Sequence, residues 1–296
     1  MKQFIQFKKQ RELGEMLSDV FTFLRNEFKL FFSLILKITL PYLVFFFIVF
    51  GFLGYTFGDF TELLTNGGNS PFEGEEMSAL IIIVSILVLS IAGIMVYALA
   101  YSTTLHYIKS YTENNGAVNA DVVKTEVKDT FWSFIGLSIL KGMALGIGLM
   151  LCVIPGIYLI VPMSIVFCIM IFEKKSVMDA FSDSFKFVKD EWWMTFLVIF
   201  VVSLIIGVIG GVLSLPTTIY TYIKMGVFSG EIDPGANPLS YFKDPIYIFL
   251  NLLSYAFKFF LNFVTIIVTI FLYFNINEKK NFTGTFEKID SLGNTE

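Results

Sequence analysis

Long apolar runs limit the fold of this chain more than any other feature of its sequence. Clear runs cover residues 36–57, 79–101, 195–214 and 254–274. Each is close to the roughly 20 residues that a helix needs to cross about 30 Å of hydrocarbon. Only 16% of the residues are charged, against about 25% in soluble domains, which need polar groups on their surface. The sequence therefore predicts an all-α, polytopic membrane helix bundle.

A further apolar stretch, residues 137–172, contains a single charge, Lys141, and is interrupted by a Pro-Gly pair at 155–156. It predicts two short helices, about 138–154 and 157–173, joined by a tight turn. Each has about 17 residues, the lower limit for spanning a bilayer, so this hairpin either crosses the membrane or is re-entrant. With it, the predicted bundle has about six membrane helices.

Basic residues are distributed unevenly along the chain. Of the 21 Lys and Arg residues, 17 lie in the segments 1–37, 102–134, 173–190 and 275–296. The loop 58–78 has five acidic residues and no basic one. Because Lys and Arg are enriched in cytoplasmic segments, both termini are predicted to be cytoplasmic, with 275–296 as a tail. Trp132, Trp192 and Trp193 each lie where such a segment meets a membrane helix, and we predict that they are interfacial anchors.

Two segments of the chain resemble each other. Residues 18–28 and 182–192 are identical at five of eleven positions, and each directly precedes a membrane helix. Self-similarity of this kind is typical of a repeated structural unit. We therefore predict one membrane domain, residues 1–296, in which each repeated unit is a cytoplasmic amphipathic helix followed by two membrane helices. The three units cover about 10–101, 118–172 and 176–274.

The leading segments of these units show helical spacing of apolar residues. The predicted apolar face of the first consists of Leu13, Met16, Leu17, Val20, Phe21, Leu24 and Phe28. That of the later copy consists of Val177, Phe181, Phe185, Val188 and Trp192. Such a helix either lies in the headgroup plane and senses lipid or a partner, or packs beneath the bundle as a structural elbow.

Three motifs resemble a known family. They are V-I-P-G-I-Y-L-I-V at 153–161, the segment 180–186 that leads into the tryptophan pair, and the charged exit of the last helix at 272–280. Over roughly residues 120–290 the chain resembles the glycerophosphodiester phosphodiesterase membrane-domain family, related to the YciC-like bacterial inner-membrane proteins. The resemblance implies a multi-helix module of the bacterial cytoplasmic membrane. Only about 22 residues follow the last predicted helix, so the family's separate phosphodiesterase barrel and its activity are not expected here.

Groups that perform chemistry are scarce in this sequence. His106 is the only histidine, and no nucleophile or orienting carboxylate is suggested near it. Cys152 and Cys168 both lie in apolar runs, where a thiol is a packing residue. We therefore predict no catalytic residue, no metal site and no cofactor, and hence no enzyme. A net charge of −4 gives no reason to expect nucleic acid as a partner.

Two lysines fall within apolar segments. Lys141 follows Trp132 by about nine residues, and Lys258 lies near the predicted outer end of helix 254–274. Each either extends its ammonium group to the membrane interface or contacts an anion or a lipid headgroup.

Two pairs of glycines have the G-x-x-x-G spacing that allows helices to pack closely in lipid. They are Gly142 with Gly146 and Gly207 with Gly211. We predict that they pack against other helices of the same chain, with a homo-oligomer as the alternative.

Two functions fit this sequence. The first is a non-enzymatic scaffold or accessory subunit that organises membrane lipids or other inner-membrane proteins. The alternative is a transporter or a lipid-translocating protein that uses a cavity between helices broken at Pro41, Pro155 and Pro162. A polar path at mid-membrane depth favours the alternative, and a solid apolar core favours the scaffold.

Overall fold

The computed structural model describes residues 4–66, 75–228, 230 and 244–293, and every regular element in these ranges is helical. Within them, the side chains at 58–66, 75–76, 78, 288 and 291–293 are not described. The five acidic side chains of the predicted loop 58–78 therefore lie outside the described side chains.

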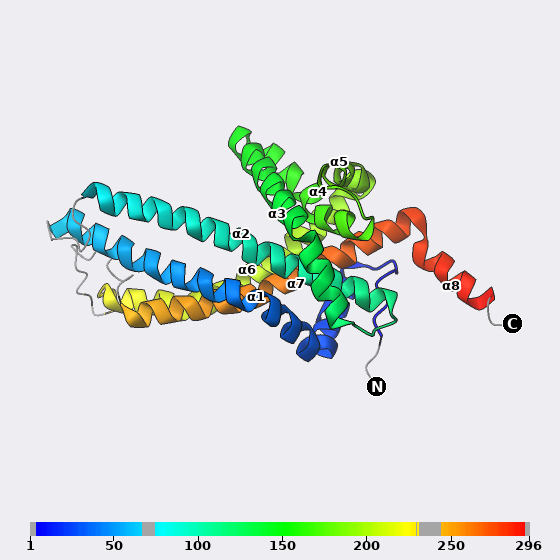
Figure 1. The fold of residues 1–296 in the computed structure, drawn as a ribbon, viewed down its shortest axis with the longest axis horizontal. Coiled ribbons are helices and arrows are strands. Elements are labelled where there is room, and N and C mark those ends of the chain that lie inside the picture. The colour runs from blue at the N-terminus through cyan, green and yellow to red at the C-terminus, as the bar shows by residue number, and fades with distance from the viewer. Residues whose placement is uncertain (1–3, 67–74, 229, 231–243, 294–296) are drawn as a thin grey trace. The chain divides into compact units, whose positions relative to one another are not determined.

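The helices follow one another along the chain (Figure 1). In chain order they are α1 (Leu13–Asn66), α2 (Glu75–Glu113), α3 (Ala120–Leu151), α4 (Val153–Phe172), α5 (Val177–Val188), a 3₁₀ turn (Lys189–Glu191), α6 (Trp192–Lys224), α7 (Pro245–Asn281) and α8 (Thr283–Gly293). Six helices are long and apolar enough to cross a membrane. The prediction of an all-α, polytopic membrane protein is confirmed.

Most of these helices are longer than predicted. α1 runs without interruption from the leading amphipathic segment into the apolar run, because no helix-breaking residue separates the two. α7 begins at Pro245, nine positions before the predicted start at 254. Proline is tolerated there because the first N–H groups of a helix have no intrahelical acceptor in any case. The predicted spans are thus the apolar middle parts of longer helices.

The turn of the α3–α4 hairpin lies at Cys152 and not at the predicted Pro155-Gly156 pair. Cys152 has extended backbone angles, with φ −172° and ψ 154°, between the last residue of α3 and the first of α4. Pro155 and Gly156 instead lie in the first turn of α4, where a proline lacks only an N–H that would be unpaired. The prediction was wrong because it read the proline as a helix end, whereas it marks a helix start.

The described chain forms two compact units. Unit 1 contains residues 1–39, 97–204 and 263–296, and unit 2 contains residues 40–96 and 205–262. Four helices, α1, α2, α6 and α7, contribute one end to each unit.

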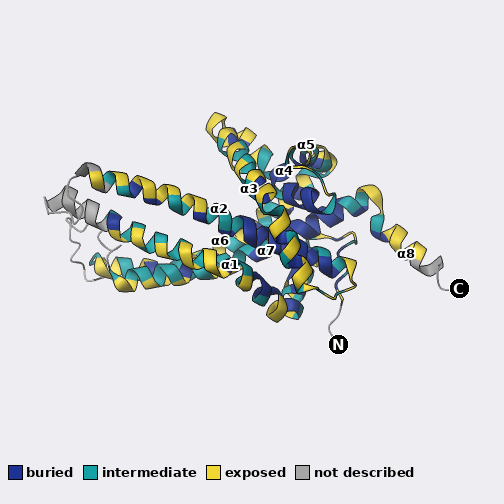
Figure 2. Ribbon diagram, in the orientation of Figure 1, coloured by how far each residue is buried: buried dark blue, intermediate teal, exposed yellow. Residues whose placement is uncertain are grey.

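Unit 1 has a dense core of aromatic side chains. Phe7 is 1% exposed, its ring stacks on Phe271 at 4.3 Å, and it contacts the edge of Phe23 at 5.5 Å. Figure 2 shows the second halves of α4 and α7 mostly in the colour of buried residues. The segment before α1 is therefore part of the core of unit 1, although it forms no helix.

Charged groups hold this N-terminal segment in place. The guanidinium group of Arg11 is buried, donates from Nε to Asp19 at 2.7 Å, and lies 4.7 Å from the ring centroid of Phe271. A matching pair occurs where the sequence resembles itself, since Lys175 donates from Nζ to Asp183 at 2.7 Å. The carboxylates of Asp183 and Glu173, which accept hydrogen bonds from Lys175, raise the pKa of that ammonium group. Equivalent positions of the two segments thus make equivalent contacts.

The leading part of α1 buries only part of the predicted apolar face. Met16, Val20 and Phe23 are 0% exposed, whereas Phe21 and Phe28 are 53% and 60% exposed. The buried stripe continues through Glu27, whose carboxylate accepts a hydrogen bond from the hydroxyl of Tyr107 at 2.8 Å. Phe21 and Phe28 are thus open to lipid or a partner, and the placement of this helix in the headgroup plane stays a prediction. The buried face also contains a carboxylate, which apolar periodicity did not predict.

In the later copy, the buried residues of α5 are Ala180, Ser184 and Val188. Of the predicted face, only Val188 is among them. Small side chains there allow α5 to approach its neighbours closely, which the search for large apolar residues missed.

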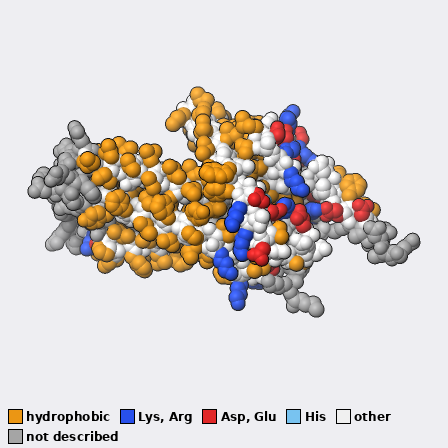
Figure 3. Space-filling view, viewed as in Figure 1, with side chains coloured by type: hydrophobic (Ala, Val, Ile, Leu, Met, Phe, Trp, Pro, Cys, Tyr) orange, Lys and Arg blue, Asp and Glu red, His pale blue; other side chains and the backbone are white. Residues whose placement is uncertain are grey.

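Unit 2 has mainly apolar side chains on its surface. Ile48, Val208 and Phe249 are each more than 60% exposed. Figure 3 shows hydrophobic side chains over the surface of α1 and α2. Such an extended apolar surface is not stable in water, and it matches the solvent that the sequence predicts, which is lipid.

Candidate intramembrane ligand pocket

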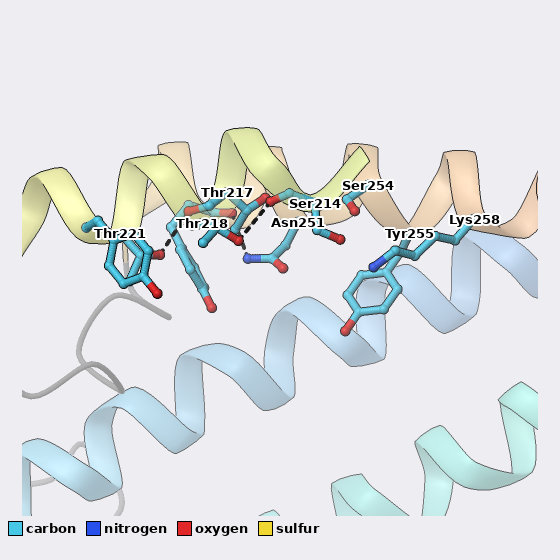
Figure 4. Close-up of a pocket in the computed structure, with 10 residues that line it drawn as sticks. Ser214, Thr217, Thr218, Thr221, Asn251, Ser254, Tyr255 and Lys258 are labelled. Atoms are coloured by element: carbon cyan, nitrogen blue, oxygen red, sulfur yellow. Dashed lines mark hydrogen bonds between the residues drawn. The ribbon is translucent and has the colours of Figure 1, made fainter. Parts of the chain in front are cut away.

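The candidate site is a cavity of about 340 Å³ within unit 2, lined by α6 and α7 (Figure 4). Most of the side chains that line it are polar. They are Ser214, Thr217, Thr218, Thr221 and Tyr222 of α6, and Tyr247, Asn251, Ser254, Tyr255 and Lys258 of α7. The size of the cavity falls at the lower end of the range of about 300–1,000 Å³ that is typical of small-ligand pockets.

Helical spacing places these groups on one face of each helix. On α6 the polar positions are 214, 217, 218 and 221, and on α7 they are 251, 254, 255 and 258. Both sets follow the i, i+3, i+4, i+7 pattern of a single helix face. The sequence therefore contains a signal for this site, a polar stripe at helical spacing in each of two segments. It was not predicted, because residues 215–245 were assigned to a loop and the last span was expected to begin at 254, whereas α6 continues to Lys224 and α7 begins at Pro245.

Three hydroxyl groups of the α6 stripe are satisfied by their own helix. Ser214 donates to the carbonyl of Gly210 at 2.9 Å, Thr218 to that of Ser214 at 3.1 Å, and Thr221 to that of Thr217 at 2.9 Å. This back-bonding is common for Ser and Thr inside helices. It uses the hydroxyl hydrogen and leaves the oxygen lone pairs available as acceptors.

Two other hydroxyl groups in the pocket have no partner within the described chain. They are Oγ1 of Thr217 and Oγ of Ser254, whose residues are 9% and 5% exposed. A buried hydroxyl without a hydrogen bond costs roughly 1–3 kcal/mol, and buried polar groups are almost always paired. Thr217 and Ser254 both line the cavity, one from each helix, and a ligand that bonded their hydroxyl groups would remove this cost.

Among the described side chains that line this pocket, Lys258 is the only basic one and none is a carboxylate. Its Nζ lies 5.5 Å from the ring centroid of Tyr255. Because α7 begins at Pro245, Lys258 lies thirteen positions inside the helix, or about 20 Å at 1.5 Å per residue. The start of α7 does not mark the membrane surface, so the two predicted placements of Lys258, at the interface or against an anion, stay predictions. An ammonium group that lines a pocket of hydroxyl groups favours an anionic ligand.

Lys141 has different surroundings, within unit 1. Its Nζ lies 3.3 Å from the hydroxyl of Tyr97, and 5.3, 5.8 and 5.9 Å from the ring centroids of Phe167, Tyr97 and Tyr101. Cation–π attraction of this kind is worth about 0.5–2 kcal/mol, more when desolvated. The described contacts of Lys141 are thus aromatic, and the predicted contact with a headgroup or anion stays a prediction.

The three tryptophans differ in their surroundings. Trp132 and Trp193 are 78% and 77% exposed, as interfacial residues would be. Trp192 instead stacks on Tyr158 at 5.7 Å and on Phe196 at 5.3 Å, and its Nε1 donates to the carbonyl of Tyr158 at 3.3 Å. The role of all three as interfacial anchors stays a prediction, and Trp192 has an additional packing role.

The predicted close-packing role of the G-x-x-x-G glycines within the chain is wrong. A methyl group built on Gly142, Gly146, Gly207 or Gly211 would meet no heavy atom within 4 Å among the described residues. The close approach is made elsewhere. A Cβ on Gly148 would lie 3.3 Å from Cα of Gly156, and one on Gly156 would lie 3.1 Å from Cα of Leu149. Spacing alone did not show which side of α3 faces α4, and a homo-oligomer through the open glycines stays a prediction.

His106 has polar neighbours that the sequence did not suggest, and its predicted isolation was wrong. Its Nδ1 lies 3.0 Å from Oε2 of Glu126, and its Nε2 lies 3.0 Å from the hydroxyl of Thr130. Lys109 donates to the other carboxylate oxygen of Glu126 at 2.5 Å. A hydroxyl, an imidazole and a carboxylate in this order resemble a hydrolytic triad.

The environment of this group indicates a structural role. His106 is 2% exposed, and the hydroxyl of Thr130 also donates to the carbonyl of Glu126 at 2.7 Å. That hydrogen is therefore directed to the backbone and not to the imidazole. The four side chains satisfy one another's hydrogen bonds between α2 and α3, as buried polar groups must.

No protein-family model, curated protein or solved structure matches this chain. The fold and the six apolar helices define the class, a multi-pass α-helical membrane protein.

Proposed function

We propose that this chain is a non-enzymatic membrane protein that binds the anionic headgroup of a lipid in the pocket between α6 and α7, and that it translocates this lipid. The observation that carries the proposal is the pair of buried, unpartnered hydroxyl groups of Thr217 and Ser254, which share one cavity with Lys258. A phosphate or carboxylate oxygen accepts hydrogen bonds from both hydroxyl groups and is attracted by the ammonium group.

A lipid fits this pocket better than a cation does. None of the described side chains that line the cavity is acidic, so among them a cation would face Lys258 without a counter-charge. The surrounding surface of unit 2 is apolar, and acyl chains can cover it. The headgroup would then occupy the polar cavity while its chains remain in hydrocarbon.

The pocket favours the second of the two functions expected from the sequence, but it lies between α6 and α7 and not between helices broken at Pro41, Pro155 and Pro162. α1 and α4 continue through Pro41 and Pro162, and Pro155 lies in the first turn of α4. A scaffold needs no cavity, and a solid apolar interior would have supported it. A polar stripe on each of two facing helices instead resembles the irregular polar paths that transporters place at membrane depth.

We further propose that the membrane is the bacterial cytoplasmic membrane, with both termini inside the cell. The support is the concentration of Lys and Arg in the four segments on one side. The resemblance of residues 120–290 to the phosphodiesterase membrane-domain family agrees with this location, and membership in that family is likewise a proposal.

Retention of lipid by the purified protein tests the binding step. We expect native mass spectrometry of the chain, released from nanodiscs that contain anionic and zwitterionic lipids, to show one retained anionic lipid. Lys258→Met should abolish this retention. The matched control is Lys141→Met, which removes the other intramembrane lysine but leaves the pocket intact. Equal retention by both variants would contradict the assignment, and retention of inorganic phosphate alone would indicate a soluble anion as the ligand.

Translocation is tested with the same variants in liposomes. We expect the reconstituted protein to expose a fluorescent anionic lipid of the inner leaflet to a membrane-impermeant quencher, and Lys258→Met to reduce the rate to that of protein-free liposomes. Retention of lipid without any translocation would support a scaffold that holds lipid, and would contradict the transport step only.

A further inference from the structure

The course of α4 in unit 1 bears on how the α3–α4 hairpin meets the membrane. At the end of α4, the ring of Phe172 lies 5.2 Å from that of Tyr273 and 4.8 Å from that of Phe274, both on α7. Near the start of α4, Tyr158 stacks on Trp192. The residue before Trp192 is Glu191, whose carboxylate accepts a hydrogen bond from Lys279 of α7 at 2.8 Å.

These contacts are incompatible with α4 crossing a bilayer alongside α7. Tyr158 precedes Phe172 by fourteen positions, which is about 21 Å along a helix. If the two helices ran side by side, Tyr158 would lie opposite a residue some fourteen positions before Tyr273. It lies instead beside the Glu191–Lys279 pair, on the opposite, charged side of Tyr273. Both ends of α4 are thus tied to the last few turns of α7, and α4 runs across α7.

The tip of the hairpin is apolar and uncovered. Met150, Leu151, Val153 and Ile154 are 89%, 76%, 63% and 76% exposed. Beyond Gly156, by contrast, residues 161–171 of α4 are almost all buried within unit 1. The second half of α4 therefore belongs to the core of unit 1, whereas the tip of the hairpin needs apolar surroundings.

We propose that the α3–α4 hairpin is re-entrant, and that its tip, Met150–Ile154, inserts into the membrane leaflet nearest Trp192 and does not reach the opposite face. Lipid covers the apolar surface of the tip. In this arrangement α1, α2, α6 and α7 cross the bilayer, and the hairpin returns to the side on which it began. The sequence left the crossing and re-entrant arrangements open.

The surroundings of the tip match the headgroup zone of a bilayer. A cavity of about 750 Å³ lies beside it, lined by Ile154, Ile157 and Trp193 and by the charged residues Lys189, Asp190 and Glu191. Asp190 and Glu191 pair with Lys280 and Lys279 of α7, at 3.0 and 2.8 Å. Tryptophan and lysine beside aliphatic side chains are typical of the level where acyl chains meet headgroups. An acyl chain fits against the isoleucines while its headgroup lies near the charges. This proposal does not depend on the pocket of unit 2.

Cysteine labelling in membranes tests whether the tip crosses. The native chain is suited to it, because Cys152 is exposed at the tip and Cys168 is buried. Single cysteines at 150, 151, 153 and 154 in a Cys152→Ser background extend the scan over the tip. Phe228→Cys reports the face that follows α6, and Lys128→Cys reports the opposite face. We expect a membrane-impermeant maleimide to label no tip position from the Phe228 face. Labelling of any tip position from that face overturns the proposal.

Quenching by lipid then identifies what covers the tip. With a fluorophore on Cys152, we expect lipids that carry nitroxides on their acyl chains to quench it more strongly than they quench the same fluorophore on Lys128→Cys. Equal, weak quenching at both sites would mean that water, a second copy or another protein covers the tip, and would overturn the proposal. Spontaneous Cys152–Cys152 crosslinking would identify the second copy.

Discussion

Unit 1 and unit 2 differ in where their unpaired polar groups lie. In unit 1, buried charges are paired, as Arg11 is with Asp19 and His106 with Glu126, and one buried hydroxyl, Thr103 Oγ1, lacks a partner among the described residues. In unit 2, two buried hydroxyls, Thr217 Oγ1 and Ser254 Oγ, lack partners among the described residues, and both residues line one cavity with Lys258. Polar groups that are satisfied internally stabilise a region, whereas unsatisfied groups gathered at one cavity are available to another molecule.

The two intramembrane lysines show the same difference. Lys141 of unit 1 has three aromatic rings of its own chain around the ammonium group. Lys258 of unit 2 has one ring, that of Tyr255, and faces a cavity. Lys141 therefore belongs to the packing of unit 1, and Lys258 is the lysine available to a ligand.

The largest expected effect concerns the aromatic core of unit 1. We expect Phe7→Ala to lower the free energy of unfolding by about 3–5 kcal/mol, the usual cost of removing a buried phenylalanine ring. The ring stacks on Phe271 and contacts Phe23, so a cavity would form where three segments meet. Unfolding in mixed micelles, followed by circular dichroism, measures this loss of free energy of unfolding.

The matched control for this substitution is Phe249→Ala in unit 2, where the side chain is 63% exposed. Because that ring faces the surrounding solvent, its removal should leave the free energy of unfolding within about 0.5 kcal/mol of the parent value. A loss at Phe249 as large as that at Phe7 would show that the described surface of unit 2 is covered by something else, such as a second copy.

Much of the fold was predictable, because composition and the length of the apolar runs indicate that lipid, and not water, surrounds the helices. The six apolar helices were all located from runs of apolar residues. Their ends were not, since a helix continues through polar residues until a breaker or a cap stops it, as α1 does between Leu13 and residue 36. The part of unit 1 before α1 was not predicted as core either, because Phe7 lies among charged residues in the sequence.

The next largest effect concerns glycines. Gly156→Ala in unit 1 should destabilise the protein by about 1–3 kcal/mol, because the new methyl group would lie 3.1 Å from the backbone Cα of Leu149. Gly207→Ala in unit 2 meets no heavy atom of the described chain within 4 Å. It should stabilise its helix by up to about 1 kcal/mol. Both changes are measured as shifts in thermal unfolding.

A destabilising effect of Gly207→Ala, together with loss of a dimer in size-exclusion chromatography with light scattering, would contradict the contrast between these two glycines. It would also indicate that glycines with no neighbour in the described chain, such as Gly207, pack against a second copy of the protein.

A smaller effect, of opposite sign, is expected in the pocket. Thr217→Val removes a buried hydroxyl that has no partner in the described chain and keeps the shape of the side chain. We expect the ligand-free protein to become more stable by about 1 kcal/mol and its retention of anionic lipid to fall. The control is Thr104→Val in unit 1, whose hydroxyl donates to the carbonyl of Ala100 at 2.8 Å. That variant should be no more stable than the parent and should retain lipid normally. Unchanged lipid retention by Thr217→Val would contradict the site.

This pocket was predictable in part. The serines, threonines and Lys258 have visible helical spacing in the sequence, so each stripe by itself was within reach. That the two stripes face each other depends on how α6 and α7 pack, and apolar periodicity says little about packing when lipid surrounds the helices. The same limit explains why Gly148 and Gly156, eight positions apart, were missed as a contact.

The smallest expected effect is a pH dependence at the end of unit 2. The hydroxyl of Tyr220 donates to Asp244 at 2.6 Å, and Lys224 lies 3.4 Å from the same carboxylate oxygen. The Tyr220 hydrogen bond, with the Lys224 charge, holds the pKa of Asp244 below its ordinary value. A carboxylate of this kind stabilises the native state fully above its unfolded-state pKa of about 3.9, and this stabilisation is lost as pH falls through the lower, native pKa.

We therefore expect the parent chain to be more thermostable than Asp244→Asn at neutral pH, and the difference to shrink as the pH falls below about 4. Comparing the two chains at each pH cancels the titration of other carboxylates that they share. Tyr220→Phe should reduce the difference at neutral pH, since it removes the hydrogen bond with the largest influence on this pKa. If the difference were constant from neutral pH to pH values well below 4, the tie between α6 and the start of α7 would not be electrostatic. The polar stripes of these helices would then be held together by packing alone.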